Sequence, residues 1–297
     1  MTTDNTTNDE IDGQVQPINK FLVAVRIRDQ WGFALNNENY DPVWPPMYDS
    51  FVVFFHGLIA VQFDGQWGFL NEQGREVVEP RYEAIEFESA DPLIRVVREG
   101  KVGFINRRAD EVITCQYAAC TEFNESGFAA YQDESELWGL LRLNGQPICP
   151  AQYDHINANS AYDGLNMFLV GRSNLYGLLN EQGAEVIPCM YDDCTGFRNN
   201  AILVQRDDHW AIVTLNHQFI TDFDFTNWND TQVKTGWLLE KAGKWGFVNE
   251  KGEEIIPIQY EAIHELAEGV FAVLDTNGLV SGFDAGGNLR TLLPELS

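Results

Sequence analysis

Short apolar or alternating stretches recur along the chain. Each covers four to seven residues rich in Val, Ile, Leu, Ala and Phe, which is typical of β-strands and too short for amphipathic helices. The stretches are FLVAVRI (21–27), LIAVQF (58–63), LIRVV (93–97), FAAY (128–131), MFLV (167–170), AILVQ (201–205), WLLE (237–240) and VFAVL (270–274). The pattern predicts a chain of many short strands.

A two-residue anchor follows each stretch, and successive anchors are 34 to 38 residues apart. The anchors are Trp31-Gly32, Trp67-Gly68, Val102-Gly103, Trp138-Gly139, Tyr176-Gly177, Trp210-Ala211, Trp245-Gly246 and a degenerate Ser281-Gly282. An aromatic residue falls 15 positions later in six copies, at Tyr82, Tyr117, Tyr153, Tyr191, Phe225 and Tyr260, and Tyr48 serves the first copy. Such a period indicates a structural repeat. We expect the Trp to be a large wedge, the Gly to permit close backbone approach and the Tyr to pack at the next interface.

Turn residues divide each repeat. Asp64-Gly65 and Ala242-Gly243 suit tight hairpins, and Gly74 and Gly252 supply a second reversal seven residues after the anchor. A third strand follows, and we expect it to end at, or lie at an exposed edge near, a proline such as Pro80. Each repeat is therefore predicted to be an antiparallel meander of three strands, with a short fourth segment after the Tyr left open.

Three copies carry the pattern most fully: QWGFLNEQGREVVEPRY (66–82), LYGLLNEQGAEVIPCMY (175–191) and KWGFVNEKGEEIIPIQY (244–260). These residues resemble the WG repeat, also called the KWG repeat, of many bacterial proteins. The resemblance covers roughly residues 20–297. It implies a β-strand repeat and a bacterial source, but it supplies neither a single activity nor catalytic residues.

The predicted fold class is all-β, a tandem array of about eight three-stranded antiparallel WG-type repeats. A closed β-propeller is favoured because closure removes exposed end repeats, and an open superhelical array is the alternative. Residues 1–17 have no Lys, no Arg and no apolar run, so we expect a flexible acidic tail there. Residues 18–297 are expected to form the repeat domain.

The net charge of -26 limits the class of partner. It argues against nucleic acid and anionic membranes, which require a basic face, and it permits a basic protein. No stretch has the roughly 18 apolar residues that a spanning helix needs, so we expect a soluble, cytoplasmic protein. The five cysteines are an odd number, which favours free thiols. Cys115, Cys120, Cys189 and Cys194 occupy matching repeat positions, so small buried side chains explain them better than a zinc site.

No pattern indicates catalysis. The sequence has no nucleophile, phosphate-binding or zinc-protease motif, so we expect no enzyme activity, no cofactor and no metal. Asp222, Asp224 and Asp230 have a superficial calcium-loop spacing. Asn227 and Val233 stand where that loop needs Gly and Glu, so a solvated turn is the better interpretation.

One polar position does recur: the residue after the aromatic is acidic in five copies. These residues are the candidate partner-binding site: Asp49, Glu83, Asp154, Asp192 and Glu261. Equivalent repeat positions project from one face, where carboxylates would concentrate negative potential. The alternative is that they form turns.

Two function classes are open. The leading hypothesis is a non-enzymatic protein whose acidic surface captures a basic protein, by analogy an immunity protein that neutralises a bacterial toxin. The alternative is a lectin-like repeat protein that binds carbohydrate or another small ligand on aromatic side chains.

Overall fold

The computed structural model describes residues 14–54, 57–87, 92–158, 161–162 and 165–291. Within these ranges the chain forms strands and turns and no helix, hence no helix long and apolar enough to cross a membrane. The chain divides into two compact units, Met1–Cys120 with Gln132–Glu134, and Thr121–Tyr131 with Ser135–Ser297. Both units have the predicted all-β structure.

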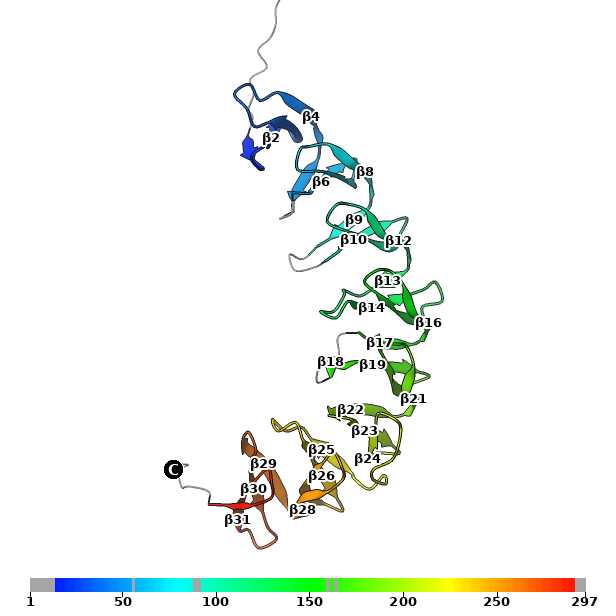
Figure 1. The fold of residues 1–297 in the computed structure, drawn as a ribbon, viewed down its shortest axis with the longest axis vertical. Coiled ribbons are helices and arrows are strands. Elements are labelled where there is room, and N and C mark those ends of the chain that lie inside the picture. The colour runs from blue at the N-terminus through cyan, green and yellow to red at the C-terminus, as the bar shows by residue number, and fades with distance from the viewer. Residues whose placement is uncertain (1–13, 55–56, 88–91, 159–160, 163–164, 292–297) are drawn as a thin grey trace, which may run out of the picture. The chain divides into compact units, whose positions relative to one another are not determined.

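Unit 1 contains three sheets in chain order (Figure 1). Each is an antiparallel meander: sheet 1 is β1-β2-β3-β4, sheet 2 is β5-β6-β7-β8 and sheet 3 is β9-β10-β11-β12. The strands of this unit are β1 (Val15–Pro17), β2 (Leu22–Ile27), β3 (Gln30–Leu35), β4 (Pro42–Tyr48), β5 (Ser50–Val53), β6 (Ile59–Phe63), β7 (Gln66–Leu70), β8 (Glu76–Tyr82), β9 (Ala84–Glu86), β10 (Ile94–Arg98), β11 (Lys101–Ile105), β12 (Glu111–Tyr117) and β13 (Ala119–Cys120).

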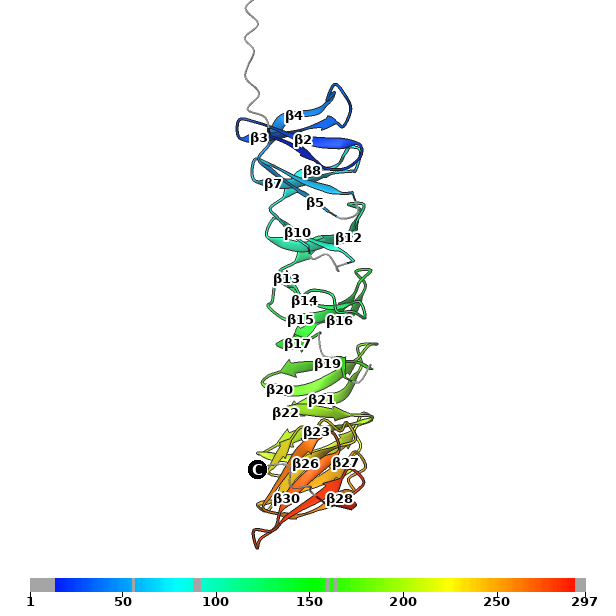
Figure 2. The same ribbon diagram turned by 90° about the vertical axis from the view of Figure 1, so that its left-hand side faces the viewer.

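Unit 2 continues the pattern, as Figure 2 also shows. Its strands run β14-β15-β16 in sheet 4, β17-β19-β20-β21 with β18 on β19 in sheet 5, β22-β23-β24 in sheet 6, β25-β26-β27-β28 in sheet 7 and β29-β30-β31-β32 in sheet 8. They are β14 (Phe128–Gln132), β15 (Trp138–Arg142), β16 (Pro147–Tyr153), β17 (His155–Asn157), β18 (Ala161–Tyr162), β19 (Leu165–Arg172), β20 (Leu175–Asn180), β21 (Glu185–Tyr191), β22 (Asp193–Arg198), β23 (Ala201–Arg206), β24 (His209–Thr214), β25 (Asn227–Asn229), β26 (Gly236–Lys241), β27 (Lys244–Asn249), β28 (Glu254–Tyr260), β29 (Ala262–Ala267), β30 (Val270–Leu274), β31 (Val280–Asp284) and β32 (Leu289–Arg290).

The described residues therefore hold the eight repeat units predicted, but most sheets have four strands. The prediction of three strands is one short, because the residues after the aromatic form the first strand of the next sheet. For example, Asp49 alone separates β4 from β5. Closure of the repeats into a propeller stays a prediction.

The predicted tail, residues 1–17, lies mostly outside the described residues. Its last three residues form β1, where Val15 faces Val25 and Pro17 faces Val23. Sheet 1 therefore begins before the predicted boundary at residue 18.

Consecutive sheets within a unit pack face to face. In sheet 6, Ile202 and Val204 pack toward sheet 5, whereas Ala201 and Leu203 pack toward sheet 7. This alternation follows from the two-residue period of a strand. It explains why the central strands are apolar at consecutive positions: both faces of an internal sheet are buried.

The anchor glycine is required by a bulge in the last strand of the sheet. Trp67 faces Tyr82 and Phe69 faces Val78, so β8 has extra residues opposite Gly68. A Cβ on Gly68 would lie 2.6 Å from the Pro80 nitrogen. The predicted close approach is confirmed, whereas the strand does not end at Pro80 but continues to Tyr82 along the sheet edge.

The anchor Trp and the Tyr opposite it differ in burial from what was expected. Tyr82 is fully covered, whereas Trp67, which faces it, is only half-buried. In the seventh copy Trp245 and Tyr260 are both half-buried, and in the sixth copy Trp210 is buried. The Trp was expected to be the large wedge of the repeat, but at Trp67 and Trp245 its side chain is only partly covered. Trp67 lies at the end of β7 that adjoins the exposed Asp64-Gly65 hairpin, where solvent reaches one side of the ring.

Sheet 8 faces the same way as the other sheets, but its anchor is displaced by one residue. In sheet 5, Ile156 pairs with Val170, both face the preceding sheet, and Val170 lies opposite the anchor Gly177. The equivalent pair in sheet 8, Ile263 and Val273, likewise packs on sheet 7, but Val273 lies opposite Ser281. A hairpin at 275–279 replaces the two-residue turn of the other repeats, which accounts for the displaced anchor.

Candidate functional site

The five predicted carboxylates occupy one type of corner. Each lies between the last strand of one sheet and the first strand of the next, and all five are exposed. The N–H of Asp49 bonds to the Gln62 carbonyl at 2.8 Å, and Ser50 also faces Gln62, so the acidic residue is the extra residue of a β-bulge. The same bond recurs from Glu83, Asp154, Asp192 and Glu261 to Val97, Gly171, Gln205 and Leu274.

Three of the side chains also cap the hairpin of the following repeat. Glu83 accepts the Gly100 N–H at 3.1 Å, Asp154 accepts the Ser173 N–H at 2.6 Å and Asp192 accepts the Asp207 N–H at 2.8 Å. Turn residues here have positive φ, 68° at Gly100 and 53° at Ser173, which directs their N–H groups out of the ladder. The turn-forming role considered from sequence is thus present at these three positions.

Glu261 has a different partner: it follows β28 and pairs with Lys244, the first residue of the adjoining strand β27. Asp49 and Glu83 belong to unit 1, and Asp154, Asp192 and Glu261 belong to unit 2. Within each unit the structure brings these residues to equivalent corners of stacked sheets, as predicted. The site is therefore two sets of exposed carboxylates.

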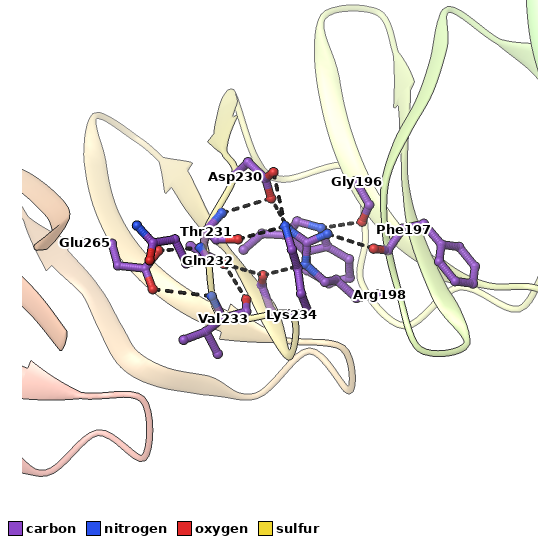
Figure 3. Close-up of polar contacts among 11 residues, drawn as sticks. Gly196, Phe197, Arg198, Asp230, Thr231, Gln232, Val233, Lys234 and Glu265 are labelled. Carbon is purple, nitrogen blue, oxygen red and sulfur yellow. Dashed lines mark hydrogen bonds and ion pairs between the residues drawn. The ribbon is translucent and has the colours of Figure 1, made fainter. Parts of the chain in front are cut away.

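A second polar site lies in unit 2, beside the segment 230–235 that joins β25 to β26 (Figure 3). An open groove of about 570 Å³ is lined by Asn229, Asp230, Thr231, Gln232, Lys234, Leu238, Ile263, His264 and Glu265. Sequence reasoning did not identify it. The only sequence signal is the polar insertion DTQVKT, and nothing in the pattern links Arg198 to Asp230, 32 residues later.

Arg198 is the charged residue at the centre of this site and is 5% exposed. Its guanidinium donates to the Phe197 carbonyl at 2.7 Å and the Gly236 carbonyl at 3.2 Å, and it pairs with Asp230. Burial raises the pKa of Asp230, but the Arg198 charge, the Thr231 N–H and Lys234 together outweigh it, so that pKa lies below its usual range. Asp230 therefore remains an anion at neutral pH and compensates the buried cation.

The other calcium-loop candidates do not converge on a metal. Asp224 pairs with Lys241 at 2.6 Å, away from the Asp230 partners. In the part of the chain that the structure describes, no group of three or more His, Cys, Asp or Glu side chains can hold a metal ion.

All five cysteines are free thiols, and Cys115 and Cys189 occupy equivalent repeat positions. The Sγ atoms of Cys115 and Cys189 lie 3.9 and 3.8 Å from the Val96 and Val170 carbonyls, so each packs against the neighbouring strand. Burial raises the pKa of Cys120 to about 12 and that of Cys189 to about 11. Their thiolates, the reactive form, are therefore scarce at neutral pH.

The family model described as "WG containing repeat" matches residues 37–67, 67–101, 103–135, 176–210 and 245–279, together more than half of the chain. No curated protein matches the chain. The anchors Trp31-Gly32, Trp138-Gly139 and Ser281-Gly282 lie outside the matched ranges.

Several solved structures are similar over most of the chain. A crystal structure of the eukaryotic initiation factor has 12% identity, covers 92% of this chain and 84% of its own, and has a TM-score of 0.36. Kluyveromyces lactis Hsv2 has 8% identity over 94% and 98% at a TM-score of 0.29. The C-terminal WD40 domain of Sif2 has 8% identity over 92% and 96% at 0.30. These scores are too low for the likenesses to decide between a ring and an open array.

Proposed function

Because the chain belongs to the WG containing repeat family, we propose that it is a non-enzymatic binding protein whose acidic surface captures a basic protein. The repeated β-fold is compatible with a protein-binding repeat protein. The observation that supports the acidic surface is the placement of five exposed carboxylates at equivalent corners.

Their hydrogen bonds are compatible with this role. A carboxylate has two oxygens with about four acceptor sites, and one N–H from a turn uses one of them. The turn contacts of Glu83, Asp154 and Asp192 also hold these side chains in place, so less conformational entropy is lost when a partner binds.

We further propose a bacterial, cytoplasmic immunity protein whose partner is a basic toxin. The net charge of -26 supports a basic partner through long-range attraction, and five free cysteines suit a reducing compartment. The link from a basic partner to a toxin is an analogy.

The test replaces the five corner carboxylates by their amides: Asp49→Asn, Glu83→Gln, Asp154→Asn, Asp192→Asn and Glu261→Gln. With a partner isolated by pull-down, we expect association about tenfold or more slower than wild type at low salt and a smaller change in dissociation, because exposed charges mainly steer encounter. Stopped-flow measurement between roughly 0.02 and 0.5 M NaCl checks this, since raising the salt shortens the screening length.

A matched control removes the same charge from the opposite end of the sheets, at exposed residues: Glu38→Gln, Glu72→Gln, Glu125→Gln, Glu253→Gln and Glu268→Gln. This control should retain more of the wild-type association rate than the corner variant. A neutral or acidic partner, or equal rates for the two variants, would contradict the role of the corners.

A further inference from the structure

The segment 230–235 contacts the sheets on both sides of its own. It belongs to sheet 7, between β25 and β26. Figure 3 shows Arg198 of sheet 6 on one side of the segment and Glu265 of sheet 8 on the other. Three consecutive sheets of unit 2 therefore meet at one connection.

The contact with sheet 6 is buried on the side of Arg198, whose side chain is 6% exposed, whereas the Asp230 side chain is 61% exposed. Asp230 pairs with Arg198 at the end of β22, and the fully buried Trp237 donates its indole N–H to the Gly196 carbonyl. The Arg198 guanidinium also lies 5.9 Å from the Trp237 ring. Removing Asp230 would leave a buried cation without its anion, which is costly, so this side of the segment is firmly held.

The polar contact with sheet 8 consists of one carboxylate that accepts two backbone N–H groups of the segment and one N–H group of its own β29–β30 turn. Glu265 of β29 accepts the N–H groups of Gln232 and Val233, the latter at 3.3 Å, and that of Gly269 at 2.9 Å. Hydrogen bonds to a charged acceptor are roughly twice as strong as neutral ones. Val233 also packs into the core between sheets 7 and 8.

Hydrogen bonds within the segment hold it in a compact turn. The Thr231 side chain is buried, with its hydroxyl 2.6 Å from the Val233 carbonyl, and its N–H bonds to Asp230 at 2.9 Å. Lys234 donates to the Thr231 carbonyl at 3.1 Å. These hydrogen bonds within the turn connect the residues that contact Glu265 to Asp230, which contacts Arg198.

The contact with the segment matters for sheet 8 because part of the apolar surface of this sheet is exposed. Its apolar side chains Phe271, Val273 and Phe283 pack on sheet 7, while Leu266 and Val280 are more than half exposed. Low burial of apolar side chains favours local opening, so we expect sheet 8 to open readily.

We propose that residues 230–235 form a strap that fastens sheet 8 to sheets 6 and 7, and that release of Glu265 lets sheet 8 open while the rest of unit 2 stays folded. The groove of about 570 Å³ beside the strap is where the separation begins, because Ile263, His264 and Glu265 of β29 line one wall and the strap lines the other.

Hydrogen exchange measured by mass spectrometry tests the proposal. In Glu265→Ala, amides of residues 262–291 should exchange about tenfold or more faster than in wild type, and amides of β19 and β20 at the wild-type rate. Glu265→Gln retains one acceptor oxygen and should give an intermediate increase. Glu268→Ala, which removes an exposed carboxylate from the same end of β29, is the control and should match wild type.

The proposal is overturned if residues 262–291 keep their wild-type exchange rate in Glu265→Ala. It is also overturned if β19 and β20 accelerate by the same factor, because the loss of Glu265 would then weaken the whole unit. Should Glu265→Ala fail to fold, the same comparison in Glu265→Gln decides.

Discussion

At the residue scale, the repeat depends most on the anchor glycine, which has no Cβ atom. A Cβ on Gly246 would lie 2.5 Å from the Ile256 carbonyl oxygen and 2.8 Å from the Ile258 nitrogen, both backbone atoms that cannot rotate away. The sixth copy has Ala211 at this position, and sheet 6 has no last strand there, only isolated bridges. Alanine is therefore tolerated in the one internal sheet whose bulged strand is absent from the described residues.

This contrast predicts that adding a methyl group at position 246 costs more stability than removing one at position 211. Gly246→Ala should lower the free energy of unfolding by about 2–3 kcal/mol, because the bulge must shift to admit the Cβ. Ala211→Gly should cost only about 1 kcal/mol, mainly through backbone entropy. Denaturant titration of both variants measures the difference.

Gly65→Ala is a useful control, since nothing lies within 4 Å of its Cβ position and only its φ of +74° opposes alanine. If Gly246→Ala costs no more than Gly65→Ala, the close contact with the bulge is not what selects glycine.

At the element scale, the features that depend on neighbouring residues could be predicted from the sequence, whereas features that depend on contacts between repeats could not. Period, strand positions and tight turns follow from residues within a few positions of one another, and they are confirmed at Asp64-Gly65 and Gly74. A short fourth segment after the Tyr was left open, because it is only three residues long at β9 and pairs with the following repeat. The strap was missed because Arg198, Asp230 and Glu265 meet only after three sheets have stacked.

The strap predicts a pH dependence at its buried end. Since the pKa of Asp230 is lowered in the folded chain, the stability it contributes is fully present above its unfolded pKa of about 3.9 and is lost as pH falls through the folded value. The difference in unfolding free energy between wild type and Asp230→Asn should therefore be constant from about pH 7 to 5 and shrink below about pH 4.

Denaturant titration at each pH gives that difference. Asp224→Asn, which breaks the exposed pair with Lys241, supplies the comparison and should cost little at any pH. A difference for Asp230→Asn that grows as the pH falls would contradict the assignment of Asp230 as the anion of Arg198.

At the scale of the whole molecule, charge has two effects of opposite sign. The chain carries 45 acidic and 19 basic residues. This excess draws a basic partner toward the protein, and it also makes the folded chain repel itself. Salt screens both effects, so it should slow capture of the partner and at the same time stabilise the free protein.

We therefore predict that the melting temperature of the free chain rises by several degrees, about 5 °C, between roughly 0.02 and 0.5 M NaCl. The corner variant and its matched control each remove five charges, changing the net charge from -26 to -21, so both should show the same smaller rise in scanning calorimetry. Their association rates should nevertheless differ, because steering depends on where the charges lie whereas self-repulsion depends mainly on how many there are. A melting temperature that falls with salt would show that attractive surface pairs, such as Glu261 with Lys244, outweigh the repulsion.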